Sequence, residues 1–283
     1  MKCSLFTFAR YIFLLSLCIF LSLNNGYALN LKVASVNIRL DTKKDSLNPW
    51  RIRKILLFEY VKNQKIDVLC LQECCKNQLS DFKTAFSGYS VVSISSRKRQ
   101  CLNVPILYST KKFDCMKSGT FWLSEHPDTK GKGWDAASSR LVTWARLKDK
   151  QTGKVLFVFN THLDNIGKIA RIESMKLIKS YMNAIANGFP ILLAGDMNST
   201  PKSMTYKLAI ADKVPMFDAY KVASKKTGVG YTFHKYGLSC TMRLDYVFVS
   251  DSIRVDNITI PKEKKVKGCF MSDHNPVVVT ISL

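Results

Sequence analysis

The sequence predicts an α/β fold for this chain of 283 residues. Short and wholly apolar runs, of which 191–194 is the clearest, are typical of strands buried on both faces of a sheet. Longer segments between such runs, for example 168–185, carry apolar residues at helical spacing. A hydrophobic share of 47% and an aromatic share of 11% supply a full core and argue against a disordered chain.

The N-terminus has the pattern of a secretory signal peptide over residues 1–28. A basic start precedes Tyr11–Leu23, an apolar run too short to span a bilayer comfortably. Small residues then fit a cleavage site after Ala28. We therefore expect an exported protein, periplasmic or secreted, in which residues 29–283 form one domain, with an uncleaved membrane anchor as the alternative.

The strands predicted after this leader are apolar runs, or stretches in which apolar and polar residues alternate. Polar loops separate them, among them 124–139 and the glycine- and aromatic-rich 227–237. In chain order the predicted strands are Leu31–Ile38, Asp67–Leu71, Tyr89–Ile94, Val104–Tyr108, Phe113–Leu123, Leu141–Leu147, Lys154–Asn160, Ile191–Ala194, Arg243–Val249, Ile253–Ile260 and Val277–Ile281.

Helices are predicted between these strands. The first opens at Pro49 and runs to Lys62, because proline suits a first turn and apolar residues follow at helical spacing. Lys168–Ile185 is long and amphipathic, and Pro201–Ala209 is short. The apolar stripes expected to face the core are Ile52, Ile55, Leu56 and Tyr60 in the first helix, and Ile172, Met175, Ile178, Tyr181 and Met182 in the second.

The formal net charge of +22 makes the chain strongly basic. Such a charge attracts nucleic acids and anionic membrane surfaces. Arg97–Arg99, Lys225–Lys226 and Lys262–Lys267 are candidate contact patches, with solvated surface lysines as the simpler alternative. The charge therefore favours an anionic partner and leaves its identity open.

Seven cysteines follow the predicted cleavage site, so at least one thiol stays unpaired within the chain. No two of them have the spacing of a zinc site. Cys70 lies in an apolar strand and is expected in the core. Cys240 and Cys269 each precede a candidate site motif, and a bridge between them is one hypothesis.

The stretch Pro190–Pro201 carries the clearest candidate chemistry. Its apolar strand stops at Gly195, and Asp196 and Asn198 follow, two residues apart. In extended backbone this spacing points both side chains to one side, off the end of the sheet. A carboxylate that activates water, beside an amide that binds a phosphoryl oxygen, would form a hydrolytic pair. A strand-end turn is the structural alternative.

Polar residues end or interrupt the apolar strands in the same way at several other places. Carboxylates and amides can hold one hard divalent cation through oxygen atoms. Two histidines can transfer protons near neutral pH. Together they suit metal-assisted hydrolysis of a phosphoester. The residues are Asn37, Glu73, His162, Asp196, Asn198, Asp245, Asp273 and His274.

The motifs around these residues resemble those of the endonuclease/exonuclease/phosphatase family, which includes deoxyribonucleases, deadenylases, sphingomyelinases and inositol phosphatases. They run in the family's order across almost the whole mature chain, which makes the resemblance specific. It implies a four-layer α/β sandwich, with two mixed β-sheets face to face and helices outside. The motifs are Ser35–Ile38, Leu71–Glu73, Asn160–Leu163, Gly195–Asn198, Arg243–Tyr246 and Ser272–Pro276.

The resemblance also implies roles for individual residues. Glu73 would be the main ligand of Mg²⁺ or Mn²⁺, helped by Asn37 and Asp273. Asp196 would orient or deprotonate the attacking water, and Asn198 would hold the phosphoryl oxygen.

The histidines and two loop residues complete the implied site. His274, oriented by Asp245, would contact the phosphate, and His162 would stabilise it from across the cleft or protonate the leaving oxygen. A narrower resemblance, to a secreted or periplasmic bacterial branch related to deadenylase-like exonucleases, rests on Phe121–Glu125, Gly133–Asp135, Arg140 and Thr143–Trp144. There Arg140 would clamp phosphate or serve as a structural surface residue. Trp134 would stack on a base or sugar, or pack against its own loop.

We expect an exported, metal-dependent phosphodiesterase, in the first place a nuclease on RNA or DNA, with 3′–5′ exonuclease action as one form. The first alternative is a phosphomonoesterase, or a phospholipid or inositol-phosphate hydrolase, on the same site. The second is a non-catalytic binder of nucleic acid or of an anionic membrane surface. A pure binder has no need of Glu73, Asp196 and His274 together. The sequence leaves the oligomeric state open.

Overall fold

The computed structural model describes residues 28–45, 47–94, 103–211, 215–238, 240–263, 265–266 and 268–283. Residues 1–27 of the predicted signal peptide and the basic cluster Arg97–Arg99 lie outside this set, as do Lys264 and Lys267 of the basic run. No helix within the described ranges is long and apolar enough to cross a bilayer. The described chain is built around two β-sheets.

The first sheet has seven strands and contains the first and the last strand of the chain. Its central strand β1 is parallel to β2 and antiparallel to β13, so the two ends of the fold lie side by side. In order across the sheet the strands are β10 (Lys225–Gly228), β12 (Arg254–Ile260), β13 (Val277–Ser282), β1 (Asn30–Asn37), β2 (Val68–Gln72), β4 (Ile106–Ser109) and β3 (Tyr89–Val92).

The second sheet has six strands and is also mixed. β7 and β8 are parallel, and the other neighbouring strands are antiparallel. In order across the sheet the strands are β5 (Phe113–Trp122), β6 (Leu141–Asp149), β7 (Val155–His162), β8 (Ile191–Asp196), β11 (Asp245–Ser250) and β9 (Met216–Asp218).

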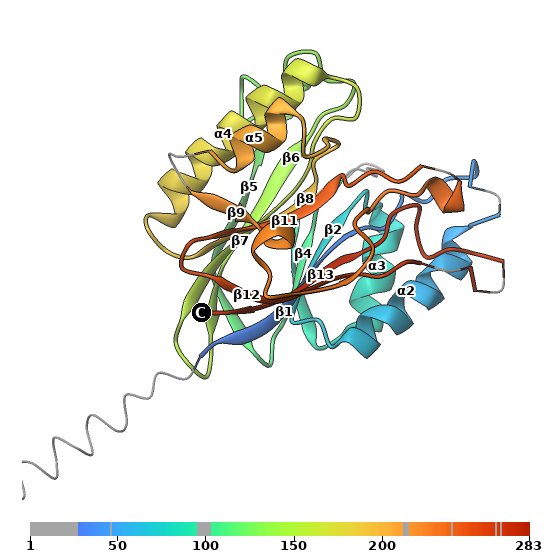
Figure 1. Ribbon diagram of the computed structural model, residues 1–283, viewed down its shortest axis with the longest axis horizontal. Helices are drawn as coiled ribbons and strands as arrows, with labels where there is room; N and C mark the ends of the chain where they lie inside the picture. The colour runs from blue at the N-terminus through green and yellow to red at the C-terminus, as the bar shows by residue number, and fades with distance from the viewer. Residues whose placement is uncertain are drawn as a thin grey trace, which may run out of the picture.

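The sheets pack face to face, and helices cover their outer faces (Figure 1). The core between the sheets contains Val33 and Val279 from one sheet and Val158 and Leu192 from the other, all fully buried. This arrangement confirms the predicted four-layer α/β sandwich. The helices are α2 (Trp50–Gln64) and α3 (Lys76–Ala85) on the seven-stranded sheet, α4 (Lys168–Ala186) and α5 (Met204–Ala209) on the six-stranded sheet, and the single turn α6 (Ala219–Val222).

The buried stripe predicted for the first helix is confirmed at Tyr60, which packs against the core, and is displaced by about one position at the other residues. The buried residues of α2 are Trp50, Arg53, Leu57 and Val61, whereas Ile55 is 62% exposed. Helical spacing is kept in both stripes, so periodicity alone cannot choose between them. The stripe that is buried is the one that contains Arg53, although a charged residue is usually exposed.

Several short elements are absent from the predicted set. The helix α3 has only Leu79 and Phe82 as large apolar residues, so its sequence lacks an apolar stripe. The strands β9 and β10 and the turn α6 are three or four residues long, which is too short for a periodic signal.

The predicted bridge between Cys240 and Cys269 is wrong, because both thiols are free. Cys70, expected in the core, is fully buried and also free. Cys75 is disulfide-bonded and precedes the first residue of α3. The disulfide-bonded cysteine, Cys75, therefore stands two residues after Glu73, whereas Cys240 and Cys269 near the later motifs are free.

A buried polar contact joins the two sheets. Asn160 Oδ1 of β7 accepts a hydrogen bond of 2.7 Å from Gln72 Nε2 of β2. Asn160 Nδ2 donates to the carbonyl oxygens of Leu71 and Pro105, at 2.8 and 3.0 Å. Because Asn160 is fully buried, these bonds replace its contacts with water. They fix β7 against β2 at the end of the sheets where the polar motifs follow.

Replacing Asn160 by alanine should lower the free energy of unfolding by about 2–4 kcal/mol, because it removes these hydrogen bonds and leaves their buried partners unpaired. Denaturant-induced unfolding measures this loss. Asn183→Ala is the control, because Asn183 is exposed on α4. An equal loss in both variants would show that Asn160 does not lock the sheets.

Candidate active site

Strand register brings the predicted site residues to one edge of the two sheets. In the six-stranded sheet, His162 of β7 and Asp245 of β11 each pair with Asp196 of β8. In the seven-stranded sheet, Asn37 ends β1 beside the end of β2, after which Glu73 follows. Residues far apart in the sequence therefore meet because adjacent strands end together.

Glu73, His162 and Asp196 line a cleft with a volume of about 480 Å³. Asn37 and Asp245 lie directly behind its wall, in hydrogen bonds to wall residues. Trp134 is half-buried and is not among the lining residues. The lining residues are Arg39, Leu40, Asp45, Glu73, Ser138, Arg140, His162, Asn165, Asp196, Asn198, Phe233, Lys235, Tyr236, Asp273 and His274.

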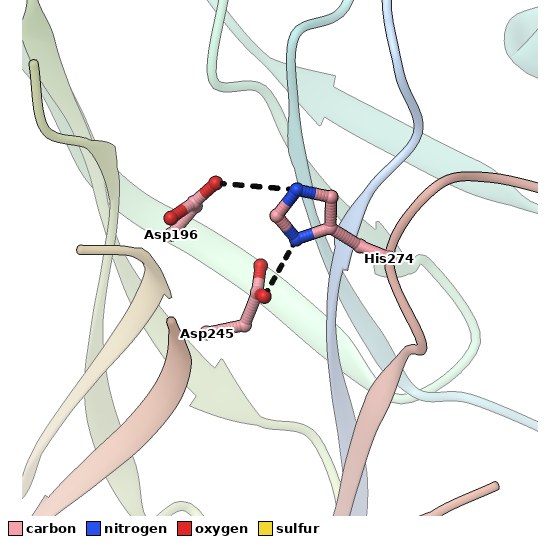
Figure 2. Close-up of side chains that lie close together, drawn as sticks. All are labelled: Asp196, Asp245 and His274. Carbon is pink, nitrogen blue, oxygen red and sulfur yellow. Dashed lines mark hydrogen bonds and ion pairs between the residues drawn. The ribbon is translucent and has the colours of Figure 1, made fainter. Parts of the chain in front are cut away.

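His274 lies between two aspartates, as Figure 2 shows. Its Nδ1 is 2.7 Å from Asp245 Oδ2, and its Nε2 is 3.8 Å from Asp196 Oδ2. The Phe233 ring packs against the imidazole, with 4.8 Å between ring centroids. All three members of the Asp245–His274–Asp196 triad are buried, so the position of the imidazole is fixed on several sides. Asp245 therefore orients His274, as the resemblance implies.

The pKa values of His274 and Asp196 are both raised in the triad. Burial alone lowers the pKa of His274, but Asp245, Asp196 and Asp273 outweigh it and raise this pKa to about 10. Burial and the charge of Asp245 raise the pKa of Asp196 to about 7, against the opposing effect of His274. At neutral pH the imidazole is therefore charged, and Asp196 exchanges a proton in the range where a general base works best.

His162 faces the same aspartate from the other side. Its Nε2 is 3.5 Å from Asp196 Oδ2 and 2.9 Å from Asn198 Nδ2. Burial, Arg140 and His274 hold the pKa of His162 well below its ordinary value, so the imidazole is neutral. Its other nitrogen, Nδ1, is buried and has no hydrogen-bond partner among the described residues.

Asn198 positions His162 in this structure. Its Nδ2 donates to the carbonyl oxygen of Leu163 at 2.9 Å and lies at the same distance from His162 Nε2. Both N–H groups of the amide are therefore used within the protein. The phosphoryl contact that the resemblance implies for Asn198 stays a prediction.

Arg140 is buried in the cleft wall, not exposed as a surface residue. Its Nε donates to Asp164 Oδ2 at 3.3 Å, and its Nη2 donates to Asn165 Oδ1 at 3.2 Å. Its third nitrogen, Nη1, is buried and unpartnered within the described chain. Burial tends to raise the pKa of Asp164, but backbone N–H donors lower it to about 2, so this carboxylate stays charged beside Arg140.

A second group of carboxylates faces the cleft around Arg39. The guanidinium lies 2.8 Å from Asp45, 3.8 Å from Glu73 and 3.9 Å from Asp273. Asn37 Nδ2 donates to Glu73 Oε1 at 3.2 Å, and its Oδ1 accepts from the Arg39 backbone N–H. In this arrangement Asn37 orients Glu73, and the metal contact that the resemblance implies for Asn37 stays a prediction.

Two sets of residues could hold a divalent cation. The triad atoms of Asp196, Asp245 and His274 lie within 4.8 Å of one another. His274 Nδ1 is already 2.7 Å from Asp245 Oδ2, which leaves only Nε2 of the imidazole for a metal. Glu73 and Asp273 line the cleft, and each has a carboxylate oxygen within 4 Å of Arg39. This donor set fits Mg²⁺ or Mn²⁺, which prefer carboxylate oxygen atoms.

Left-handed backbone recurs around the cleft. Arg39, Glu73, Asn198, Lys235 and Tyr236 line the cleft and have φ between 43° and 57°. Such conformations cost energy in residues other than glycine and persist where the surrounding structure fixes them. Arg39, Glu73 and Asn198 turn the chain one or two residues after a strand ends, and Lys235 and Tyr236 lie in the turn η1.

The cleft contains residues that the sequence analysis did not select. Tyr236 of the turn η1 (Lys235–Gly237) donates a hydrogen bond of 3.1 Å to Asp45 Oδ2, across 191 positions of sequence. No local pattern connects such distant residues. For Arg39 a signal exists, because it stands two residues after Asn37 in the same strand-end motif.

Comparisons with known proteins agree with this site. The description "Endonuclease/Exonuclease/phosphatase family" matches residues 34–274. A crystal structure of an endonuclease/exonuclease/phosphatase from Bacteroides vulgatus is 34% identical, covers 90% of this chain and 99% of that one, and has a TM-score of 0.86. The structure of a mannosyl-6-phosphatase from Bacteroides thetaiotaomicron is 32% identical, with 89% and 99% coverage and a TM-score of 0.82.

A more distant match is Nocturnin from Xenopus laevis, 25% identical over 261 residues that cover 82% of this chain and 65% of that protein. The matched region begins at Ala34 in β1 and ends at His274, so it contains both carboxylate groups and both histidines of the cleft. The resemblance inferred from the motifs is confirmed: the chain belongs to the endonuclease/exonuclease/phosphatase family.

Proposed function

We propose that this protein is an exported hydrolase of phosphoesters that depends on Mg²⁺ or Mn²⁺ and prefers a compact phosphomonoester. One observation carries the proposal: among the described residues, Arg140 Nη1 has no hydrogen-bond partner, and it is buried in the wall of the cleft that contains Asp196, His162 and His274. A buried N–H of a guanidinium without a partner is costly, and an anionic phosphoryl oxygen would satisfy it. Membership of a family of phosphoric ester hydrolases supports the same chemistry.

The residues of the cleft divide the work of hydrolysis. Asp196, hydrogen-bonded to Asn37 and to the Asn198 backbone N–H, would accept a proton from the attacking water. Attack of the water oxygen would form a new bond to phosphorus and break the bond to the leaving oxygen, which would take up a proton from His162 or from solvent. His274 is held in its charged form by Asp245 and would place an N–H at the phosphate. A divalent cation held by Glu73 and Asp273 would neutralise charge on the phosphoryl oxygens.

A compact substrate is favoured by a hydrogen bond between two loops at the wall of the cleft. Tyr236 and Asp45 both line it, and their hydrogen bond links two loops at the wall. Arg39 reinforces the link through two hydrogen bonds to Asp45, at 2.8 and 3.1 Å. A link of this kind restricts a polymer that must pass through the cleft more than a terminal phosphate. The similar protein from Bacteroides thetaiotaomicron is described as a mannosyl-6-phosphatase, which supports a sugar phosphate.

A nuclease is the second candidate, because the net charge of +22 favours a polyanion. Lys235 lines the cleft, is exposed, and has no carboxylate within 4 Å in the described chain. Such a lysine could contact the next phosphate of a nucleic acid or a second anionic group of a small substrate. Stacking of Trp134 on a base or sugar belongs to this candidate and remains a prediction.

A substrate panel decides between the two candidates. Purified protein is incubated with mannose 6-phosphate, single-stranded RNA, plasmid DNA, a phosphoinositide and sphingomyelin, each with Mg²⁺, Mn²⁺ or a chelator. We expect metal-dependent release of phosphate from the sugar phosphate at the highest kcat/KM. Metal-dependent cutting of RNA or DNA with no phosphate release from monoesters would establish the nuclease instead. Equal turnover with chelator would contradict the metal dependence.

Asp196→Asn should lower kcat by about 10²–10⁴-fold, because it removes the proton acceptor and keeps the shape. It should leave thermal stability nearly unchanged, since the fold already favours the neutral form of this buried carboxyl. Turnover and thermal unfolding are measured on the same preparation. Asp114→Asn, at an exposed position of β5, should change neither quantity. If Asp196→Asn lost stability and activity together, the residue would be structural.

Without metal, the protein should lose stability as pH rises from about 7 to about 10. The pKa of His274 is about 10 in the fold and about 6.5 in the unfolded chain. The contribution of His274 to the free energy of unfolding is therefore complete below pH 6.5. It is lost as pH rises through the folded pKa, by up to about 1.4 kcal/mol per pH unit. Urea unfolding in chelator at several pH values measures the slope. His274→Gln should show a smaller slope, and an identical slope would exclude the charged imidazole.

A further inference from the structure

Arg53 is the largest side chain that is completely buried in the described structure. It belongs to the inner face of α2 and has no carboxylate within 4 Å among the described residues. Taking an unpaired guanidinium out of water is costly unless its hydrogen bonds are replaced. A residue of this kind in an otherwise apolar stripe therefore needs a compensating set of acceptors.

Those acceptors are all backbone carbonyl oxygens. Arg53 Nε donates to Asn48 at 2.8 Å, and Nη2 donates to Arg39 and Leu40 at 3.1 and 3.2 Å. Nη1 donates to Ile38 and, at 3.4 Å, to Met271. The five N–H groups of the guanidinium thus meet five carbonyl groups, and the set is complete. The carbonyls come from two segments more than 200 residues apart, 38–48 and 271.

Both segments carry residues of the cleft. The Leu40 N–H donates to Glu73 Oε2 at 3.1 Å, and the turn before it is held in left-handed backbone, with φ of 54° at Arg39. Met271 directly precedes Ser272, whose hydroxyl donates to the carbonyl of Asn37 at 2.6 Å. Asp273 follows in the same segment. Carbonyl groups that converge on one point repel one another, so a central cation is required to hold them.

We propose that Arg53 is a positioning residue for the divalent cation. It holds two segments in one geometry: the Leu40 turn, which orients Glu73, and the Met271 segment, which presents Asp273. Arg53 touches neither substrate nor metal and acts only through the backbone. This inference rests on the proposed function, because it assigns Glu73 and Asp273 as the carboxylates that hold the metal. Lysine cannot take over the role, since its single nitrogen has three donors and no planar fork.

The test compares Arg53→Lys with Leu57→Ala. Leu57 is buried one turn further along α2 and packs in the same core, so its loss weakens the helix without touching the carbonyl set. Calorimetric titration with Mn²⁺ gives Kd, and thermal unfolding gives Tm. We expect both variants to lower Tm, but only Arg53→Lys to raise the Kd for Mn²⁺, by about 10- to 100-fold. Excess Mn²⁺ should recover much of the lost kcat in Arg53→Lys alone.

An unchanged Kd in folded Arg53→Lys would overturn the inference and leave the proposed function standing. A wild-type protein that binds no Mn²⁺ would refute the metal-dependent function itself, and the inference with it. If Arg53→Lys does not fold, hydrogen exchange of the wild type decides. Mn²⁺ should then slow exchange at the Leu40 and Met271 amides together. Protection of only one of these segments would show that Arg53 does not couple them.

Discussion

The functional edge of this fold depends on the hydrogen bond between Asp245 and His274, 2.7 Å long and buried. One imidazolium stands beside two carboxylates, so the triad would carry an excess negative charge if Asp196 were also ionised. Two N–H donors, the Asn198 backbone and the Asn37 side chain, hydrogen-bond to Asp196 and stabilise its ionised form against this excess negative charge. The sheets must then hold all of these residues in register, because a shift of one position in β8 or β11 would turn a carboxylate away.

The sheets also determine where strain is tolerated. Glu73 follows the end of β2 in left-handed backbone, and Asn198 does so two residues after β8 ends. Each lies just beyond a strand that is buried on both faces. Rigid strands fix the start of each turn, while hydrogen bonds such as Leu40 N–H to Glu73 fix its end. Strain at these two positions orients side chains that face the cleft.

Much of the site could be predicted because its residues interrupt apolar strands. Asp196 is visible in the sequence since an apolar run stops at Gly195, and that glycine is required: a Cβ there would lie 2.1 Å from the Thr161 carbonyl oxygen. The layers of the fold followed from the family motifs. The hydrogen bond between Tyr236 and Asp45 could not be predicted, because it joins residues that only the tertiary fold brings together.

The error in the α2 stripe has a physical reason of the same kind. Sequence periodicity treats burial as a property of apolar residues, and Arg53 is buried because five carbonyl groups surround it. Those carbonyls belong to loops whose shape no local pattern encodes. A charged residue inside a helical stripe therefore indicates that its side chain hydrogen-bonds to the backbone of neighbouring loops. In this protein those loops carry residues of the cleft.

Three arginines near the cleft differ in whether their guanidinium groups are fully partnered within the protein. This difference separates an arginine that is free to bind a ligand from one that is structural. Arg53 is complete, with a carbonyl for every N–H. Arg39 lies within 4 Å of Asp45, Glu73 and Asp273, so carboxylates already balance its charge. Arg140 has a carboxylate and an amide for two nitrogens, and the part of the chain that the structure describes offers no partner for the third. Evolved interiors rarely leave a buried guanidinium nitrogen unpaired, so the missing partner of Arg140 is best sought in the substrate.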